Sequence, residues 1–299
     1  ILLVFGNTSE ERHCERFQKL SRGTVADMTR GPEDVYDDVA VDAWIQDDPD
    51  PVTRAELTEL LSAARSHGEQ AQAARRALSD AFSGTLAFGT AGLRGRLGGG
   101  PNRMNRVVVI RAAAGLSAYL KDRLGEGFSV VIGYDARHNS EQFALDTAAV
   151  VTGAGGRAIL FESHCPTPVL AFALRRLEAD AGVMVTASHN PPQDNGYKVY
   201  LGGRAVTDSG QGAQIVPPYD SQIAAAIDAV GPVSSVPRPQ SGWETVDPEI
   251  REEYIERAAQ AARMTAPAPV KIVLTAMHGV GGATCREVLA RAGFTDVVE

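Results

Sequence analysis

Short apolar runs alternate with amphipathic segments along the middle of the chain. Continuous apolar runs are typical of strands buried on both faces, whereas apolar residues spaced by three or four predict helices. The pattern predicts strands at 129–134, 157–161 and 181–186, and helices at 140–151 and 168–177. Because these elements alternate strictly, we expect βαβ units, and hence an α/β fold with a mixed, largely parallel sheet flanked by helices.

Further elements are expected on both sides of this alternating core. Asp50 precedes a helical pattern as its N-cap, and Asn105 does the same for a second helix. A strand at 197–201 follows a loop and is expected to run antiparallel to its neighbour. The remaining expectations are helices at 70–82, 106–124, 221–230, 248–264 and 284–292, extended segments within 86–97, and strands at 270–276 and from 296.

The pattern also divides the chain into four parts. Residues 1–40 lack periodicity, and we expect a poorly ordered leader there. Residues 41–230 hold the first domain, and the segment at 231–246 is rich in Pro, Gly and Ser, which predicts a linker. Residues 247–299 read as the start of a second α/β domain, and we expect that domain to be incomplete.

Composition narrows the classes of function. The 299 residues are 44% hydrophobic and carry a net charge of −8, so broad electrostatic binding of nucleic acid is not expected. No apolar run reaches the length of a membrane span, so no membrane partner is expected. The three cysteines, Cys14, Cys165 and Cys285, form no C-x-x-C pair. We therefore expect neither disulfides nor a cysteine zinc site, and we expect a reducing cytoplasm.

The segment 186–198 concentrates the residues that can do chemistry. Ser188 comes just after the buried strand at 181–186, and ligands bind at this end of the strands in open α/β sheets. His189 is its neighbour, and Lys198 follows after a loop. A hydroxyl with an imidazole and an ammonium nearby suits nucleophilic catalysis or phosphate handling. An ordinary polar turn before Asn190 is the alternative interpretation.

Three motifs in sequence order give this segment a family context. Thr186-Ala-Ser-His-Asn-Pro191 resembles the phosphoserine loop of the α-D-phosphohexomutases, a family of phosphoglucomutases, phosphomannomutases and phosphopentomutases. Phe88-Gly-Thr-Ala-Gly-Leu-Arg-Gly95 resembles the opening motif of that family. Val131-Ile-Gly-Tyr-Asp-Ala-Arg137 resembles its strand-ending G-x-D-x-R motif. The resemblance is sharp over residues 86–201.

The resemblance implies an enzyme that interconverts hexose 1-phosphate and hexose 6-phosphate through a phosphoserine and a bisphosphate intermediate. Ser188 takes the phosphoserine position, and His189 and Lys198 lie near its phosphate, with Lys198 favoured for handling the proton. Arg94 is expected to contribute to catalysis and to bind phosphate oxygens. Thr90 belongs to the same opening motif and is a further candidate for phosphate binding.

Two more phosphate-binding candidates and a metal follow from the resemblance. Asn190 and Arg137 match positions near the phosphate, although a structural pairing of Arg137 with Asp135 is an equal alternative. Mg²⁺ is expected on the Ser188 phosphate and on the carboxylates of a D-x-D-x-D-R loop, which does not occur in these residues. Asp48-Pro-Asp-Pro51 is a decoy that reads as the start of a helix.

Several interpretations stay open at this stage. Because the metal loop is missing, we expect no mutase turnover by the chain alone. A serine hydrolase using Ser188 and a non-catalytic remnant that binds sugar phosphates are the alternatives. The stretches at 193–198 and 216–220 resemble the longer bacterial phosphoglucomutase and phosphopentomutase branch. These stretches do not indicate whether a glucose, mannose or pentose phosphate is preferred.

Other polar features are given a structural interpretation. The glycine-rich segment 275–284 lacks a Walker A lysine and reads as a tight turn. The arginines near Gly98-Gly-Gly100 read as a solvated loop. The histidines without a partner at metal-ligand spacing are His13, His67, His138 and His164.

Overall fold

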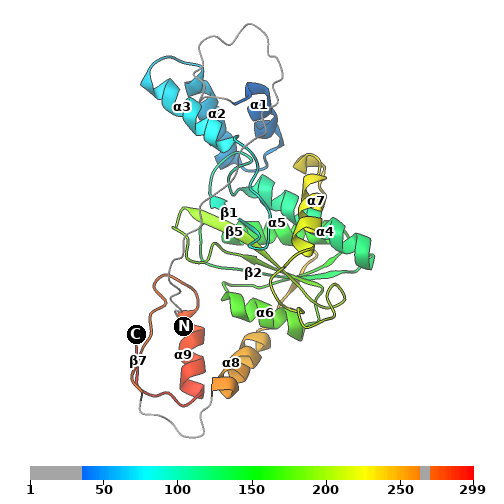
Figure 1. Cartoon of the computed structure of the whole chain (residues 1–299), viewed down its shortest axis with the longest axis vertical. Helices are drawn as coiled ribbons and strands as arrows, with labels where there is room; N and C mark the ends of the chain where they lie inside the picture. The colour runs from blue at the N-terminus through cyan, green and yellow to red at the C-terminus, as the bar shows by residue number, and fades with distance from the viewer. Residues whose placement is uncertain (1–35, 263–269) are drawn as a thin grey trace.

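The computed structural model describes residues 36–262 and 270–299 (Figure 1). The leader expected at 1–40 lies outside the described residues as far as residue 35. Its last part does not fit that expectation, because helix α1 (Asp38–Asp47) already begins there, with the Asp37 carboxylate accepting the N–H of Val39. Helix α1 is short and has few apolar residues, so the sequence shows no clear periodic pattern there.

A mixed six-stranded sheet in the order β1-β5-β4-β2-β3-β6 forms the centre of the molecule. The strands β2, β3, β4 and β6 run parallel, whereas β5 is antiparallel to both β4 and β1. This confirms the expected α/β class and the antiparallel strand. The strands are β1 (Leu93–Arg96), β2 (Ser129–Tyr134), β3 (Arg157–Leu160), β4 (Ala181–Val185), β5 (Asp194–Leu201) and β6 (Glu244–Thr245).

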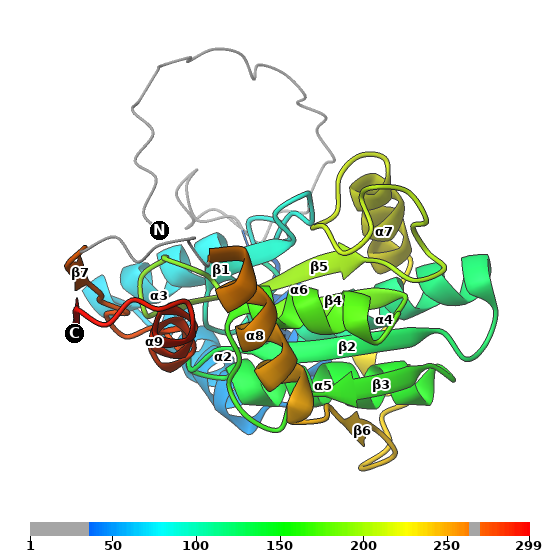
Figure 2. The ribbon, with the colours of Figure 1, turned by 90° about the horizontal axis from the view of Figure 1, so that it is seen from below.

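Helices cover both faces of the sheet (Figure 2). We call one side the α5 face, which α4 (Arg106–Leu124), α5 (Ser140–Gly153) and α7 (Tyr219–Asp228) cover. The opposite side is the α6 face, covered by α6 (Thr167–Arg176) and α8 (Glu249–Ala262).

Successive side chains of a strand point to opposite faces, and β2 shows this directly. Val130 and Ile132 belong to the core of the α5 face, whereas Val131 belongs to the core of the α6 face. All three are fully buried, and each such side chain contributes about 1.5–3 kcal/mol through burial. The continuous apolar run in the sequence is explained by this double burial.

The winding of the chain reverses beside β2. From β2 the chain passes through α5 to β3 on one side, and it then returns through α6 to β4 on the other side of β2. The carboxyl ends of β2 and β4 therefore flank a topological switch point, where open α/β sheets bind ligands. Asp135 follows β2 there, and the loop with Ser188 follows β4.

Three helices precede the sheet and pack around a small core of their own. The helices are α1, α2 (Pro51–Ala64) and α3 (Glu69–Ala81), and Leu57 and Leu78 are fully buried between them. Asp50 caps α2 as predicted, with its carboxylate 2.9 Å from the N–H of Val52.

The expected linker at 231–246 is instead part of the sheet domain. The β6 strand pairs with β3 at Ile159 and Leu160, and Val233 and Val246 are buried. A strand of two residues is too short to show an alternating pattern of apolar and polar residues. The pairing therefore depends on the free edge of β3 and not on the local sequence.

The last described segment forms a small unit beside α8. Strands β7 (Ile272–Val273) and β8 (Val297–Val298) pair in parallel, and α9 (Gly282–Arg291) packs against α8. Arg251 and Glu287 form an ion pair of 2.7 Å between the two helices. The strand expected at 270–276 is thus much shorter than its apolar run. None of the helices in 36–262 and 270–299 is long and apolar enough to span a bilayer.

Asp47 anchors the N-terminal helices to the sheet domain, and its removal tests that anchor. Its carboxylate accepts the backbone N–H groups of Val233, at 2.7 Å, and Ser234, at 2.9 Å. We expect Asp47→Ala to lower the free energy of unfolding by about 1–3 kcal/mol in denaturant melts at pH 7, because two N–H groups lose their acceptor. Asp42→Ala is the control and should cost at most about 0.5 kcal/mol, because Asp42 only pairs with exposed Arg65.

The same anchor predicts a pH dependence. Burial raises the pKa of Asp47, but the hydrogen bonds from Ser234 and Val233 outweigh it, and the net pKa is lowered. The anchor therefore stabilises the fold above the ordinary carboxyl pKa and is lost as the pH falls through the lowered value. The difference in stability between the unaltered chain and Asp47→Ala should shrink on acidification. A difference that stays constant from pH 7 to pH 3 would contradict this assignment.

Candidate active site

The loop after β4 holds Ser188 in a fixed and exposed position. The N–H of Ser188 donates to Thr186 Oγ1 at 2.9 Å, and the N–H of Asn190 donates to the carbonyl of Ala187 at 3.1 Å. Ser188 has a φ of 58°, a left-handed conformation that costs a non-glycine residue about 1–2 kcal/mol. The surrounding hydrogen bonds hold this conformation, and the side chain of Ser188 lies at the surface.

The guanidinium of Arg137 holds this loop in place by hydrogen bonds to its backbone carbonyls. Its Nη1 donates to the carbonyls of Pro191, at 2.9 Å, and Asp194, at 3.0 Å. Its Nη2 donates to the carbonyls of Ser188, at 2.9 Å, and Asn190, at 2.8 Å. We call these four bonds the carbonyl clamp. A guanidinium suits this role because its N–H groups form a rigid, planar fork.

Asp135 orients the clamp. Its Oδ2 lies 3.3 Å from Arg137 Nε, and its Oδ1 accepts the backbone N–H of Arg137 and, at 2.8 Å, the hydroxyl of Ser140. Every nitrogen of the Arg137 guanidinium therefore has a partner within the protein. This arrangement favours the structural alternative for Arg137 over phosphate binding, since its donors already serve the loop.

Asn195 is a supporting residue that the sequence pattern did not indicate. Its side chain is fully buried, and its Nδ2 donates to the carbonyl of His138, at 2.9 Å, and to Ser140 Oγ, at 3.0 Å. Its Oδ1 accepts the N–H of Gly196. These bonds join the start of β5 to the loop after β2. The one signal in the sequence is a small amide beside a glycine at the start of an apolar strand.

Strand alternation places the candidate cations on one side of the sheet. Leu93 and Tyr197 point to the α5 face. Their neighbours Arg94 and Lys198 therefore point to the α6 face, on the adjacent strands β1 and β5. Asp135 follows Tyr134, which also belongs to the α5 face, so Asp135 shares the side of the two cations.

Lys198 lies in an environment that lowers its pKa. Burial lowers its pKa, the positive charge of Arg94 lowers it further, and Asp135 offsets part of the shift. Within the described ranges its ammonium makes no hydrogen bond or ion pair. A half-buried lysine with a lowered pKa can act as a proton acceptor as well as a cation.

Arg94 is connected to the loop through Asn190. Arg94 Nη1 donates to Asn190 Oδ1 at 3.0 Å, and Asn190 Nδ2 donates to Asp194 Oδ2 at 2.8 Å. The structure thus brings Arg94, Asn190 and the Ser188 loop together. The amide of Asn190 serves to position Arg94, while the rest of the Arg94 fork makes no other hydrogen bond within 36–262 and 270–299.

His189 and Thr90 are placed less decisively. His189 is exposed, and its Nδ1 lies 3.4 Å from Ser188 Oγ, at the long limit of a hydrogen bond. In the part of the chain that the structure describes, no carboxylate orients its ring. Thr90 is exposed at the tip of a turn, where its carbonyl accepts Gln214 Nε2.

Gly92 explains why the opening motif is rich in glycine. Its φ is 73°, and a Cβ there would lie 2.0 Å from the carbonyl oxygen of Tyr197. Only glycine permits both the left-handed conformation and this close approach of the turn to β5. The approach brings β1 alongside β5, and hence Arg94 alongside Lys198.

The described residues do not make up a site for a divalent cation. They contain no group of three His, Cys, Asp or Glu side chains that could hold a metal ion. Near Ser188, the carboxylates of Asp135 and Asp194 are already bonded to Arg137 and Asn190. A metal on a Ser188 phosphate would need further ligands from other residues.

Several of the polar residues that we discounted have partners in the structure. Near Gly98-Gly-Gly100, Arg106 is paired with Asp146 at 2.7 Å, and Arg103 is paired with Asp80, so the charges of these two arginines are compensated. His164 packs edge-on against Tyr134. His13 lies outside the described residues. Cys165 and Cys285 are free thiols, and burial raises the pKa of Cys165 to about 12.

Comparison with known proteins gives this geometry its family. Residues 85–231 match the family model described as "Phosphoglucomutase/phosphomannomutase, alpha/beta/alpha domain I". A "Probable phosphomannomutase" of Haemophilus influenzae is 48% identical over 193 residues, which cover 64% of this chain and 38% of that protein. A "Phosphoribomutase" of Saccharomyces cerevisiae is 38% identical over 201 residues, covering 66% of this chain and 29% of that protein.

The fold agrees with these matches. The crystal structure of a "putative phosphomannomutase" from Thermus thermophilus superposes with a TM-score of 0.58 at 27% identity, over 72% of this chain and 45% of that one. The chain spans less than half the length of each of these relatives. Its three motifs, its sheet order and its matched domain all point the same way, and the chain belongs to the α-D-phosphohexomutase family.

Proposed function

We propose that this chain carries the phosphoryl-transfer region of a phosphosugar mutase, with Ser188 as the phosphate carrier. The observation that carries the proposal is the exposed Ser188 hydroxyl, held at the switch point by the carbonyl clamp. Arg94 and Lys198 share one face of the sheet beside it. A nucleophile in fixed position next to cations is what phosphoryl transfer requires, since that chemistry depends on positioning and charge stabilisation.

In the proposed reaction the phosphate moves between Ser188 and the sugar. Phosphorylated Ser188 donates its phosphoryl group to a hydroxyl of a hexose monophosphate: the Oγ–P bond breaks, and a bond from the sugar oxygen to phosphorus forms. The sugar hydroxyl releases its proton, and the Ser188 oxygen takes one up. The resulting bisphosphate reorients and returns its other phosphate to Ser188, so hexose 1-phosphate and hexose 6-phosphate interconvert.

Lys198 and Arg94 take separate roles in this proposal. Lys198, with its lowered pKa, exchanges the proton with the reacting oxygens. Arg94, held by Asn190, binds oxygens of the transferring group. Thr90 and His189 stay candidates for phosphate contacts at the rim. Arg137 acts through the loop and is a positioning residue.

The residues around Ser188 do not by themselves determine which metal and which sugar phosphate bind. We propose Mg²⁺ as the metal, with the Ser188 phosphate as one of its ligands; when bound, the ion neutralises charge on the phosphoryl group. Glucose, mannose and pentose phosphates are the candidate substrates, in line with the printed names of the relatives. We expect no turnover by the chain alone.

The remaining proposals concern organisation and place. We propose that residues 41–230 form the first domain, although β6 extends its sheet to residue 245, and that 247–299 begin a second. We propose a cytoplasmic location, with no nucleic acid or membrane as partner.

The proposal is tested in a chimera with one of the longer relatives. Residues 85–231 replace the matching segment of the Haemophilus influenzae relative, and mutase activity is measured with glucose 1-phosphate, mannose 1-phosphate and ribose 1-phosphate. We expect activity in the chimera and a loss on the order of 10³-fold or more with Ser188→Ala. Ser209→Ala, in an exposed loop, is the matched control and should leave activity unchanged.

Phosphopeptide mapping separates the alternatives. A mutase gives phosphate on Ser188 of the chimera after incubation with glucose 1,6-bisphosphate. A serine hydrolase instead gives stable fluorophosphonate labelling of Ser188 and no native phosphate. Binding of hexose phosphate without phosphorylation identifies the non-catalytic remnant. Either of the last two results overturns the proposal.

The role of Arg137 is tested by its kinetic signature. In the chimera we expect Arg137→Met to lower kcat by about 10²-fold, because a loop displaced by about 1 Å misplaces the phosphate. KM should change far less, since Arg137 does not touch the substrate. Arg175→Met, an exposed arginine at the far end of α6, should have no effect. A rise in KM at constant kcat would instead indicate direct phosphate binding by Arg137.

The coupling between Arg94 and Lys198 is tested by titration. We expect Arg94→Met to raise the pKa of Lys198, because the removal of a neighbouring positive charge favours the protonated form of the lysine. The measurement is a ¹³C NMR pH titration of lysine-labelled chain, with the Lys198 signal assigned through Lys198→Arg. Arg175→Met should leave that pKa in place. An unchanged Lys198 pKa in Arg94→Met would show that the two cations do not interact.

A further inference from the structure

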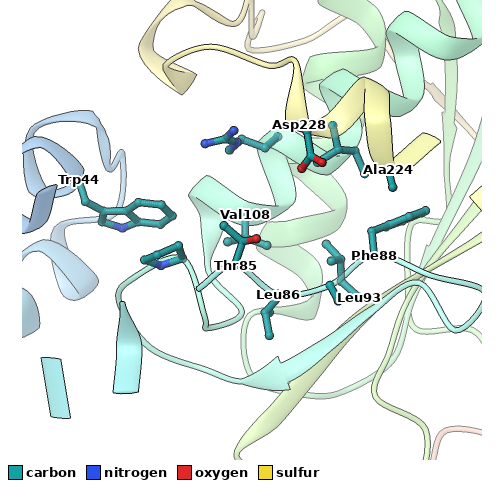
Figure 3. Close-up of a pocket in the computed structure, with 12 residues that line it drawn as sticks. Trp44, Thr85, Leu86, Phe88, Leu93, Val108, Ala224 and Asp228 are labelled. Carbon is teal, nitrogen blue, oxygen red and sulfur yellow. The ribbon is translucent and has the colours of Figure 1, made fainter. Parts of the chain in front are cut away.

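A cavity lies away from the Ser188 loop, between the N-terminal helices and the helices of the α5 face. It has a volume of about 250 Å³ and opens between α1, the segment 85–93, α4 and α7 (Figure 3). Its apolar walls are formed by Trp44, Leu86, Phe88, Leu93, Val108 and Ile227.

The sheet edge separates this cavity from the candidate active site. Leu93 lines the cavity and points to the α5 face, whereas the next residue, Arg94, points to the α6 face. The cavity therefore shares a wall with the segment that carries Thr90 and Arg94, but it does not share their side chains.

Two donors beside the cavity have no hydrogen-bond partner among residues 36–262 and 270–299. Trp44 Nε1 is buried and makes no hydrogen bond, an unfavourable state for an indole N–H. Arg111 is half-buried, and its guanidinium makes no hydrogen bond within 36–262 and 270–299. Asp47 is a charged neighbour of Arg111 but is already engaged by Val233 and Ser234. The acidic lining residue Asp228 is exposed, so water solvates its charge.

We propose that this cavity binds a small organic carboxylate with an apolar body of one or two rings. The unpartnered guanidinium of Arg111 matches a carboxylate, since it can bind both oxygens through a planar fork. The volume fits the rings, because an apolar cavity of about 150 Å³ already accommodates benzene. Trp44 stands at one end of the pocket and Phe88 at the other, which gives the rings aromatic walls (Figure 3).

The position of the cavity gives such a ligand a second effect. It would touch α1, α4, α7 and the segment 85–93 at once, so it would join the N-terminal helices to the sheet domain. A ligand that binds only the folded chain also raises its thermal stability by mass action.

The experiment uses 2-naphthoate as the probe and 2-naphthylmethanol as its neutral counterpart, with isothermal titration calorimetry of the whole chain. We expect 2-naphthoate to bind with a Kd of about 1 mM or tighter. The alcohol should bind at least about tenfold more weakly, because a charged hydrogen bond is lost. This comparison needs no altered protein, so it does not depend on any variant folding.

Two variants locate the binding. Ala224→Phe fills the cavity from α7 and should abolish binding, while Ala225→Phe, at the exposed neighbouring position, should leave it unchanged. Arg111→Met should weaken binding of 2-naphthoate about tenfold and leave the alcohol unaffected. The proposal is overturned if neither probe binds at millimolar concentration, if both bind equally, or if Ala224→Phe binds like the unaltered chain.

Discussion

The bonds between Arg137 and four backbone carbonyls are the interaction on which the candidate site depends. The loop after β4 turns sharply, and its residue Ser188 adopts a left-handed conformation that is unfavourable by itself. Without donors from outside, its carbonyls would face only water, and the loop would sample many conformations. One guanidinium, oriented by Asp135, supplies those donors and ties the end of β4 to the end of β2. The exposed hydroxyl is thus held in place before any ligand arrives, which is what a phosphate carrier requires.

Strand alternation does the rest of the positioning. A residue that points to the α5 face has neighbours that point to the opposite side. Arg94 of β1, Lys198 of β5 and Asp135, which follows β2, therefore share one side of the sheet. Gly92 allows β1 to approach β5 closely enough for this arrangement. The lowered pKa of Lys198 follows from burial and from the charge of Arg94. The same alternation places the side chain of Leu93 in the wall of the separate apolar cavity, so successive residues of β1 face two different environments.

Much of this arrangement could be predicted from the sequence, and the failures have physical causes. Strands buried on both faces, such as β2 and β4, leave long apolar runs and were predictable. The three motifs also singled out the segments of Ser188, Arg94 and Arg137, which the fold brings to one region of the sheet. Helix α1 and strand β6 were missed, because their formation depends on packing and on a free strand edge and not on a local pattern. The role of Arg137 could not be read either, since backbone carbonyls are invisible in a sequence, and only the fold shows that they point at its guanidinium.

Amide hydrogen exchange tests the central claim, that Arg137 fixes the Ser188 loop. The measurement compares the amides of residues 186–196 in the unaltered chain and in Arg137→Met, with the amides of β4 as the internal reference. If the clamp holds the loop, the amides of Ser188, Asn190 and Asp194, each hydrogen-bonded within the loop, should exchange at least about tenfold faster in the variant while those of β4 stay protected. Unchanged exchange in the loop, or an equal increase throughout the sheet, would contradict the claim.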